Sequence, residues 1–428
     1  MYNFLRRSFF RILYNTGQTL RPLLAKIMPN SVKEILKRFE YKIIKVSTST
    51  QNISRCLSNN FEAGINLIGY AHAEMGIGES CRLAANAIQT TKIPFGIINV
   101  SVGNPARMND FSWKHKEINK AFYSTNIFHI NAEQMPLVHI HLGEGFFTGH
   151  YNIGYWHWEL PDFPDEWIDS FNLLHEIWVP SNFVLESISR KSRIPVVRIP
   201  HAIEIKPSQE VNRTFFNLPN KSFLFMAMYD THSVQQRKNP QAVVEAFKLA
   251  FNKDDTSVGL VLKVLNGKSN PLEIDNLKNT IQNNKNIYLL EEFFNRQQVN
   301  SLINITDCFV SLHRSEGFGL GLAEAMYLGK PVIGTNWSGN TDFMNNRNSC
   351  VVDYELIQVG ADYGPYKAYQ VWADPDVEQA AYFMRKLVDD HEWYRKIAAK
   401  GQETMYKYFS PKTVGELVKQ RLGRIGLI

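Results

Sequence analysis

The chain has 428 residues, of which 44% are hydrophobic and 21% are charged. These values are typical of a soluble globular protein with two or three domains, and they exclude a disordered chain, a collagen-like repeat and a disulfide-rich miniprotein. No uncharged apolar run approaches the ~20 residues that a membrane-spanning helix needs. The sparse cysteines form no CxxC pair, which predicts reduced thiols in a cytoplasmic protein and no structural zinc. They are Cys56, Cys81, Cys308 and Cys350.

The net charge of +6 is concentrated at the N-terminal end. Residues 1–45 hold ten basic and two acidic side chains, so the rest of the chain carries a net charge of −2. A nucleic-acid-binding protein more often carries its positive charge on the folded domain. The charge pattern therefore favours no nucleic-acid partner.

Residues 1–60 are expected to form a basic amphipathic helical arm followed by a polar linker. Ser31 and Glu34 fit a capping box, and apolar residues between Val32 and Val46 then recur at helical spacing, with basic residues on the other face. Such helices suit an anionic membrane surface, where each basic residue contributes about 1 kcal/mol. Residues 1–46 are thus expected either to bind such a surface or to pack on the protein itself.

From Phe61 onward, apolar strands alternate with helices in two successive runs, which predicts two Rossmann-like α/β domains, 61–205 and 206–409, facing a cleft. A last helix, within 410–428, is expected to pack back on the first domain. The expected strands of the first run are Ile65–Tyr70, Phe95–Val100, Asn126–Asn131, Asn152–Trp156, Glu176–Pro180 and Val196–Pro200. Those of the second run are Ser222–Met228, Val258–Leu265, Ile287–Leu290, Cys308–Leu312 and Pro331–Thr335.

The strongest motif, SLHRSEGFGLGLAEAM, spans Ser311–Met326. A strand is expected to end near His313, a glycine-rich turn follows, and a helix is expected to start near Leu320. Glycines in such a turn let backbone N–H groups approach a phosphate, and the helix N-terminus adds positive potential there. Glu316 precedes the turn and Glu324 lies on the helix, so the two carboxylates can contact two parts of one ligand.

Together with the GKPVIG segment that follows, this motif resembles the nucleotide-sugar site of retaining family-4 glycosyltransferases, often described as glycosyl transferases group 1. The resemblance implies the GT-B fold, in which two Rossmann-like domains face a cleft. It also implies that Glu316 faces the donor sugar and that Glu324 binds the ribose hydroxyls. The turn between them would hold the diphosphate, through Gly317, Phe318 and Gly319. A solvated helical carboxylate is the alternative for Glu324.

The segment QRKNP at Gln236–Pro240 resembles the basic site of the same family on the donor diphosphate. Arg237 and Lys238 would stabilise the charge of a departing nucleoside diphosphate without a metal. The family often has an arginine a few residues upstream, where this chain has Asp230. A surface pair at a helix start is the alternative for the two basic residues.

The first half of the chain supplies candidates for the donor, the transferred sugar and the acceptor. Gly76 and Gly78 resemble the family's N-terminal glycine loop and would offer backbone amides to a phosphate across the cleft. Asn131 takes the second position of the family's His-x-His strand end, where it could hydrogen-bond the transferred sugar but could not act as a base. Aromatic faces stack on sugars, so a later aromatic strand end supplies acceptor-binding candidates, with core packing as the alternative. They are Trp156, His157 and Glu159.

Asp374 and Asp376 form a D-x-D pattern, by which other glycosyltransferases hold a divalent metal. The same segment fits a helix start, with a capping aspartate, Pro375 at the first helical position and a helix at Val377–Leu387. The sequence favours the helix start. No other cluster of His, Asp or Cys has metal-ligand spacing, so neither a metal nor another cofactor is expected.

The resemblance implies transfer of a sugar from a nucleoside-diphosphate sugar to a glycan or lipid-linked acceptor, with retention of anomeric configuration. The expected setting is bacterial polysaccharide or lipopolysaccharide biosynthesis, in the cytoplasm or at the inner face of the cell membrane. No covalent nucleophile stands out, which agrees with a front-face route in which the leaving phosphate assists deprotonation of the acceptor. The alternatives are a nucleotide-sugar epimerase of GT-B fold and a membrane-bound scaffold with a degenerate site. The joint presence of Glu316, Glu324 and Lys238 disfavours the scaffold.

Overall fold

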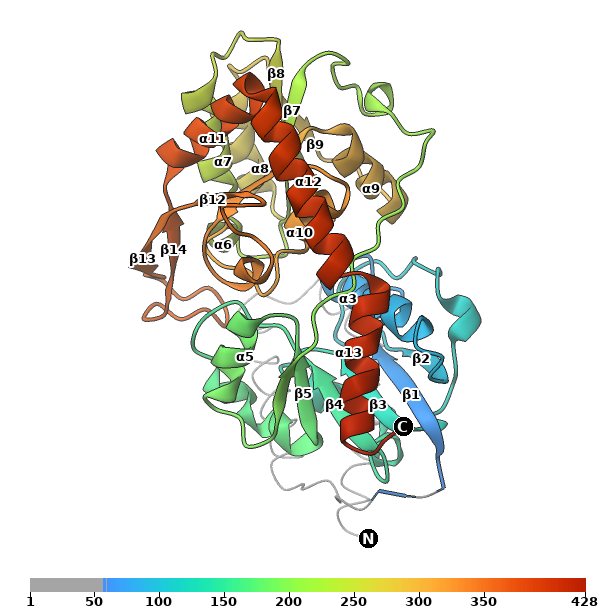
Figure 1. Ribbon diagram of the computed structural model, residues 1–428. Helices are drawn as coiled ribbons and strands as arrows, with labels where there is room; N and C mark the ends of the chain where they lie inside the picture. The colour runs from blue at the N-terminus through green and yellow to red at the C-terminus, as the bar shows by residue number, and fades with distance from the viewer. Residues whose placement is uncertain (1–56, 59) are drawn as a thin grey trace.

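The computed structural model describes residues 57, 58 and 60–428. The expected membrane-binding arm of residues 1–46, and all but three residues of the arm and linker of 1–60, lie outside the described residues. Two α/β domains lie one above the other, each built on a six-stranded parallel sheet (Figure 1). Across the described ranges, no helix is both long and apolar enough to cross a membrane.

The N-terminal domain contains a sheet in the order β2-β1-β3-β4-β5-β6. The order reverses at β1, so the crevice between β1 and β3 is the place where a ligand binds in sheets of this kind. Every strand expected in this half is present, with its ends shifted by a few residues. The strands are β1 Glu62–Gly69, β2 Phe95–Asn99, β3 Tyr123–His129, β4 Tyr151–Tyr155, β5 Glu176–Val179 and β6 Val196–Arg198. The α-helices are α3 Gly76–Gln89, α4 Met135–Leu142 and α5 Asn182–Ser189.

The C-terminal domain contains a sheet in the order β12-β11-β10-β7-β8-β9, the strand order of dinucleotide-binding domains. The reversal lies between β7 and β10, so the loops that follow these two strands meet. The strands are β7 Phe223–Asp230, β8 Val258–Leu265, β9 Ile287–Leu290, β10 Cys308–Ser311, β11 Val332–Thr335 and β12 Cys350–Val352. The α-helices are α6 Gln235–Lys238, α7 Pro240–Ala250, α8 Pro271–Ile281, α9 Arg296–Ile305, α10 Leu320–Tyr327, α11 Val377–Asp389 and α12 His391–Tyr408.

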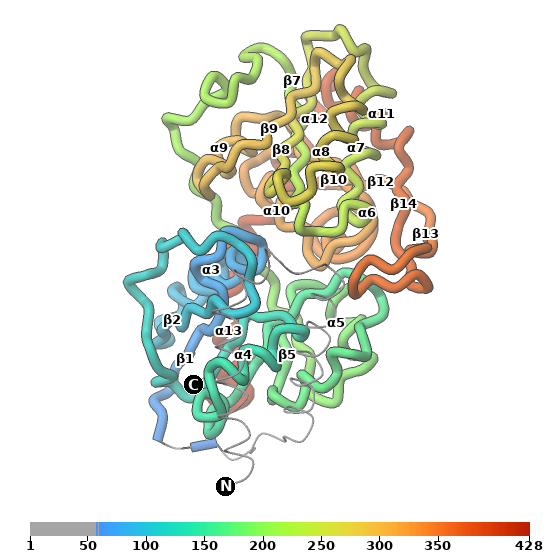
Figure 2. The backbone as a smooth tube through the Cα atoms, turned by 180° about the vertical axis from the view of Figure 1, so that it is seen from behind, coloured from blue at the N-terminus to red at the C-terminus, as the bar shows by residue number. Residues whose placement is uncertain are grey.

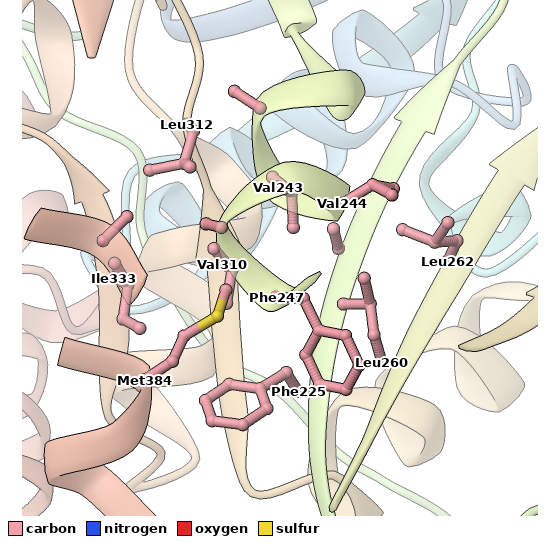
Figure 3. Packing of buried hydrophobic residues seen from close by; sticks show 14 of the residues in the cluster. Phe225, Val243, Val244, Phe247, Leu260, Leu262, Val310, Leu312, Ile333 and Met384 are labelled. Carbon is pink, nitrogen blue, oxygen red and sulfur yellow. The ribbon is translucent and has the colours of Figure 1, made fainter. Parts of the chain in front are cut away.

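The core of the C-terminal domain forms where α7 and α11 cover one face of its sheet (Figure 3). Phe225 and Leu260 from the sheet meet Val243 and Phe247 of α7, and Met384 of α11 closes the cluster. Burial of each such side chain contributes roughly 1.5–3 kcal/mol. The interior strand β8, VGLVLKVL, is nearly all apolar because it is covered on both faces.

An antiparallel hairpin, β13 Tyr354–Gln358 and β14 Val371–Pro375, leaves the C-terminal domain at the left of Figure 1. We call the segment 354–375 the interdomain hairpin, because its loop packs on the N-terminal domain. Tyr366 and Trp372 belong to the same buried hydrophobic cluster as Trp158 of that domain. The sequence predicted no strand here.

The last helix, α13 Pro411–Arg424, crosses back to the N-terminal domain, as expected. It lies along the first sheet in Figure 1, and its buried face joins the hydrophobic cluster that contains Ile88 of α3. Arg421 donates through Nε and Nη2 to the buried Glu176, at 2.8 and 2.6 Å. The chain end is therefore fixed to the first domain by both apolar packing and a two-point ion pair.

Candidate active site

A cleft of about 690 Å³ lies between the domains, at the carboxyl ends of both sheets. The start of α3 and the segments after β3, β4 and β6 line one side, and the loops after β7, β9 and β10 line the other. Most of the predicted site residues line it: Gly76, Asn131, His157, Glu159, Arg237, Lys238, Glu316, Gly317, Phe318, Gly319 and Glu324. Gly78 and Trp156 do not.

Glu316 meets two cations at the entrance of the glycine turn. Lys238 Nζ donates to Glu316 Oε1, and Arg237 Nη1 lies 3.5 Å from the same oxygen. Burial would raise the pKa of Glu316, but the charges of Lys238 and Arg237 outweigh it and lower the pKa to about 2. Glu316 is therefore ionised at neutral pH.

Arg237 is buried, which rules out the surface-pair alternative for this residue. It lies in the short helix α6, whose end at Asn239 adopts a left-handed conformation (φ 51°) before α7 begins. Its Nη1 donates to the backbone carbonyl of Ser315 at 2.8 Å, whereas its buried Nε has no hydrogen-bond partner among the described residues. A buried donor without a partner is costly.

The glycine turn joins β10 to α10 in the way the sequence predicts. Gly319, at φ 90°, is the N-cap residue of α10, and this left-handed conformation favours glycine. The carbonyl oxygen of Gly317 accepts a hydrogen bond from the hydroxyl of Ser181, which belongs to the N-terminal domain, at 2.7 Å. The turn thus presents the N-terminus of α10 to the cleft, where it favours an anion.

Glu324 is 1% exposed, which rules out the solvated alternative. Arg296, the first residue of α9, donates through Nη1 and Nη2 to its two carboxylate oxygens. The Nε of Arg296 also lies 3.2 Å from Glu79 Oε1 of α3, so one arginine joins both domains where α3 and α9 face each other (Figure 2). Burial raises the pKa of Glu324 more than Arg296 lowers it.

Glu159, predicted to bind the acceptor, is engaged with the other domain. Its Oε2 accepts a hydrogen bond from the hydroxyl of Tyr366 in the interdomain hairpin, at 3.0 Å, and its Oε1 lies 3.9 Å from Arg237 Nη2. The hydroxyl of Ser315 donates to its backbone carbonyl. Tyr366 also stacks on Trp158, with ring centroids 5.4 Å apart. These contacts hold the domains together beside Glu316.

Asn131 and His157 are adjacent on the N-terminal wall. The backbone N–H of His157 donates to Asn131 Oδ1 at 3.0 Å, and His157 Nδ1 lies 3.3 Å from the same oxygen. His201, which follows β6, places its Nε2 3.1 Å from His157 Nε2. Burial lowers the pKa of His157 to about 4 and that of His201 well below its usual value, so both rings are neutral at neutral pH.

Two predicted residues serve packing instead of the cleft. Gly78 lies in the first turn of α3, where a Cβ atom would be 2.1 Å from the carbonyl oxygen of Ala73, so a glycine is needed for close packing. Trp156 is fully buried and packs against Phe163 and Phe171. Core packing, the alternative for the aromatic segment, therefore describes Trp156.

The D-x-D segment leads into a helix that begins at Val377, the residue expected from the sequence. Asp376 is the N-cap of α11, and its Oδ1 accepts from the backbone N–H of Gln379 at 2.8 Å. Pro375 ends β14, so the prediction that it is the first helical residue was wrong; pairing with β13 extends the strand to this point. Asp374 Oδ1 accepts from Arg314 at 2.7 Å. In the described ranges, no group of three His, Cys, Asp or Glu residues has metal-binding geometry.

Sequence reasoning missed Arg296, Tyr366 and His201. Arg296 follows the capping box formed by Asn295 and Gln298, which predicts a helix start but not a partner across the cleft. His201 carried one usable signal, its place just after a strand at the carboxyl edge of the sheet. Tyr366 carried none.

Residues 216–357 match the model of the family described as glycosyl transferases group 1, and no curated protein matches the chain in sequence. Among solved structures, HepE of Anabaena in complex with UDP-glucose is 13% identical (TM-score 0.61), over 84% of this chain and 99% of that one. Sucrose-phosphate synthase from Thermosynechococcus elongatus is 13% identical (TM-score 0.60), over 85% and 99%.

The pneumococcal O-GlcNAc transferase GtfA, in complex with UDP and GlcNAc, is 15% identical (TM-score 0.50), over 70% of this chain and 56% of that one. The chain thus spans about half the length of GtfA and nearly the whole length of the other two. At these identities the likeness establishes the fold. The chain therefore has the GT-B fold of these structures, and residues 216–357 of its second domain are similar to the family of glycosyl transferases group 1.

Proposed function

We propose that the protein transfers a hexose-type sugar from a nucleoside-diphosphate sugar to a glycan or lipid-linked acceptor, with retention of anomeric configuration. One observation carries the proposal: Glu316, Lys238 and Arg237 meet at the glycine turn inside the interdomain cleft. The UDP-glucose bound to HepE and the UDP and GlcNAc bound to GtfA support the substrate class.

In this proposal the donor diphosphate lies against Lys238, Arg237 and the N-terminus of α10. Charge-assisted hydrogen bonds from the two cations stabilise the negative charge that develops on the departing nucleoside diphosphate. Because the protein itself supplies this positive charge, we propose that transfer needs no metal and survives excess chelator. Gly76, at the open start of α3, is the donor contact proposed from the opposite wall.

Glu316 and Glu324 have different tasks in the proposed reaction. The ionised Glu316 accepts hydrogen bonds from the donor sugar beside the reacting carbon. Glu324 accepts hydrogen bonds from the ribose hydroxyls of the bound donor. These hydrogen bonds replace the ones that Arg296 donates to Glu324 in the structure. Two carboxylates seven residues apart thus bind the two ends of one donor.

Retention follows if the acceptor attacks on the face from which the diphosphate leaves. A phosphate oxygen of the leaving group then takes the proton of the acceptor hydroxyl, so the protein needs no base of its own. Asn131 and His157 form the wall opposite the donor turn and are proposed to bind the sugar and the acceptor. Glu159 lines the cleft beside them and links this wall to the interdomain hairpin through Tyr366.

The test is transfer by the purified chain from a panel of nucleotide sugars to glycan and lipid-linked acceptors. We expect nucleoside diphosphate release that depends on acceptor, equal rates with and without EDTA, and an α-linked product from an α-linked donor by NMR. An inverted product would contradict retention. Rearranged donor without acceptor would favour an epimerase.

We further propose that the acceptor is lipid-linked, in bacterial polysaccharide or lipopolysaccharide synthesis, and that residues 1–46 bring the enzyme to the inner face of the cell membrane. Ten basic side chains in the first 45 residues support this location, since an anionic leaflet attracts such a segment. A lipid-linked acceptor would present its reactive hydroxyl close to that surface.

A further inference from the structure

His201 lies in the cleft wall but has no task in the proposed reaction. It is 6% exposed and lines the cleft together with His157 and Asn131. Its ring meets the ring of Phe318, from the donor-side turn, edge-on with centroids 4.9 Å apart. His201 therefore contacts both walls at the point where donor and acceptor would meet.

The donor and the acceptor of each hydrogen bond between Asn131, His157 and His201 follow from the chemistry of these groups. A backbone N–H can only donate, so the atom of Asn131 that faces the His157 N–H must be its carbonyl oxygen. His157 Nδ1 lies 3.3 Å from the same oxygen, and a hydrogen bond there requires a proton on Nδ1. Neutral His157 then has an unprotonated Nε2.

The donor and acceptor atoms of the hydrogen bond between His157 and His201 follow in the same way. The Nε2 of His201 faces the unprotonated Nε2 of His157 at 3.1 Å, so the proton between them must belong to His201. With its proton on Nε2, neutral His201 has an unprotonated Nδ1, which lies 3.4 Å from the Tyr155 hydroxyl; that hydroxyl donates to the carbonyl of Ile199 at 2.8 Å. The order of donors therefore runs from His201 to His157 to Asn131.

We infer that His201 is a positioning residue for sugar transfer: through His157 it adds a second hydrogen bond that holds the side-chain amide of Asn131 in the orientation set by the backbone N–H of His157, with its NH₂ group toward the cleft. Asn131 lines the cleft, and its amide nitrogen has no partner among the described residues, so it is free to donate to a hydroxyl of the transferred sugar or of the acceptor. The inference rests on the proposed function and adds a residue to it.

The groups that surround the pair keep it neutral. Burial chiefly lowers the pKa of His201, His157 and His129 lower it further, and the Tyr155 hydroxyl on its other side is neutral because burial raises its pKa. If His157 were protonated, two N–H groups would face each other across 3.1 Å unless His201 changed tautomer. The arrangement thus works only with both rings neutral.

Three variants test the inference on the full chain. His201→Leu introduces an apolar side chain of moderate size and removes the donor. His201→Gln introduces an amide NH₂ group that can donate to His157 in place of the imidazole N–H. We expect kcat to fall roughly tenfold in His201→Leu, the effect of one lost hydrogen bond, with the donor KM within ~2-fold. We expect His201→Gln to recover most of kcat. His391→Leu, an exposed histidine at the start of α12, is the control and should change nothing.

A double variant of His201 and Asn131 distinguishes an effect of His201 on the position of Asn131 from a general loss of stability. If His201 acts through Asn131, then His201→Leu should cost little more in an Asn131→Ala background, because the group it positions is already absent. Additive losses, or equal kcat in His201→Leu and the wild type, would overturn the inference. Equal losses in His201→Leu and His201→Gln at an unchanged melting temperature would do the same.

Histidine tautomers give a readout that needs no activity. Long-range ¹H–¹⁵N NMR of the histidine-labelled protein should place the proton of His157 on Nδ1 and that of His201 on Nε2. A proton on His157 Nε2 would refute the inference even if transfer occurs. The expected tautomers without any transfer would leave the arrangement intact and refute the proposed function instead.

Discussion

Glu316, which is partly buried, and Glu324, which is fully buried, are two carboxylates of one motif, yet their pKa values shift in opposite directions. Burial acts to raise both. Glu316 meets two cations, Lys238 and Arg237, which lower its pKa to about 2. Among the described residues, Glu324 meets one cation, Arg296, which also serves Glu79, and burial keeps its pKa raised. The number of cations that each carboxylate meets therefore decides the direction of its pKa shift.

Replacing Lys238 with alanine should weaken both donor binding and turnover. A diphosphate would lose a charge-assisted partner worth ~1.5–3 kcal/mol, which is roughly a ten- to hundredfold loss in kcat/KM. Steady-state kinetics with varied donor measure this. Lys285→Ala, far from the cleft and paired with Asp254 on the surface, is the matched control. Wild-type kinetics in Lys238→Ala would remove it from the donor site.

Variants of Glu316 and Glu324 should change different kinetic constants. Glu316→Gln removes the charge beside the reacting sugar, so kcat should fall more than donor affinity. Glu324→Ala removes a group that binds substrate and transition state alike, so donor affinity should fall ten- to hundredfold, for a charged hydrogen bond of ~1.5–3 kcal/mol. If both variants changed only the donor KM, Glu316 would be a binding residue.

At the scale of elements, the interdomain hairpin controls how the two walls of the cleft meet. It leaves the C-terminal domain after β12, and the match to the family ends inside it, at residue 357. Its loop then ties to the N-terminal domain through hydroxyls of Tyr366 and Tyr369, which donate to Glu159 and Asp162 at 3.0 Å each. The hairpin thus resists separation of the domains on the Glu159 side of the cleft.

The two tyrosines form a matched pair for a test of the hairpin. Tyr366 is 7% exposed and Tyr369 is 66% exposed. Tyr366→Phe should lower the free energy of unfolding by about 1 kcal/mol, because the buried Glu159 contact loses its donor. Tyr369→Phe should change it by less than ~0.5 kcal/mol. Chemical denaturation of both variants gives the comparison, and equal effects would mean that the buried hydroxyl has no special part in joining the domains.

For the whole molecule, buried histidines make folding sensitive to acid. Burial lowers the pKa of His129, His157 and His201 below the usual 6.5. Below pH 6.5 the unfolded chain binds protons that the folded chain does not, so each group removes stability as the pH falls from about 6.5 toward its folded pKa. The ionised Glu316 adds a loss between about pH 4.5 and 2.

His201→Gln isolates one of these contributions, since glutamine does not titrate. The loss of stability between pH 7.5 and pH 5 should be about 2 kcal/mol smaller in this variant than in the wild type, from 1.36 kcal/mol per pKa unit. Denaturant unfolding at both pH values measures it. An equal loss in both proteins would show that His201 already accepts a proton at pH 5 in the folded state.

The proposed membrane arm also belongs to the whole molecule, because it sets where the cleft meets its acceptor. Co-sedimentation of the full chain with anionic vesicles should fall as salt rises, since the Debye length shrinks from about 8 Å at 0.15 M to ~3 Å at 1 M. A chain that lacks residues 1–46, and neutral vesicles, are the controls. Equal sedimentation of the full and shortened chains would rule out the arm as the anchor.

The sequence alone determined what local pattern can encode. Alternating apolar strands and helices predicted two parallel sheets, and the glycine turn with its two glutamates predicted a phosphate-binding helix start at Leu320. Every expected strand is present. The strands that were missed are β12, which has three residues, and the hairpin of β13, which is largely exposed, and β14, which pairs with β13. Short or exposed strands carry little hydrophobic periodicity, so nothing in their sequence marks them.

Only the tertiary structure decided which side chains share the cleft. Glu159 and Tyr366 are 207 positions apart and hydrogen-bond across two domains, and Arg296 joins Glu324 to Glu79 in the same way. Such pairs depend on how the domains pack, which no local spacing encodes. Packing likewise places Trp156 in the core of the N-terminal domain and not in the cleft. The wall of the cleft proposed to bind the donor could be located from the sequence because one continuous segment builds most of it, whereas the opposite wall comes from strand ends that meet only in the folded chain.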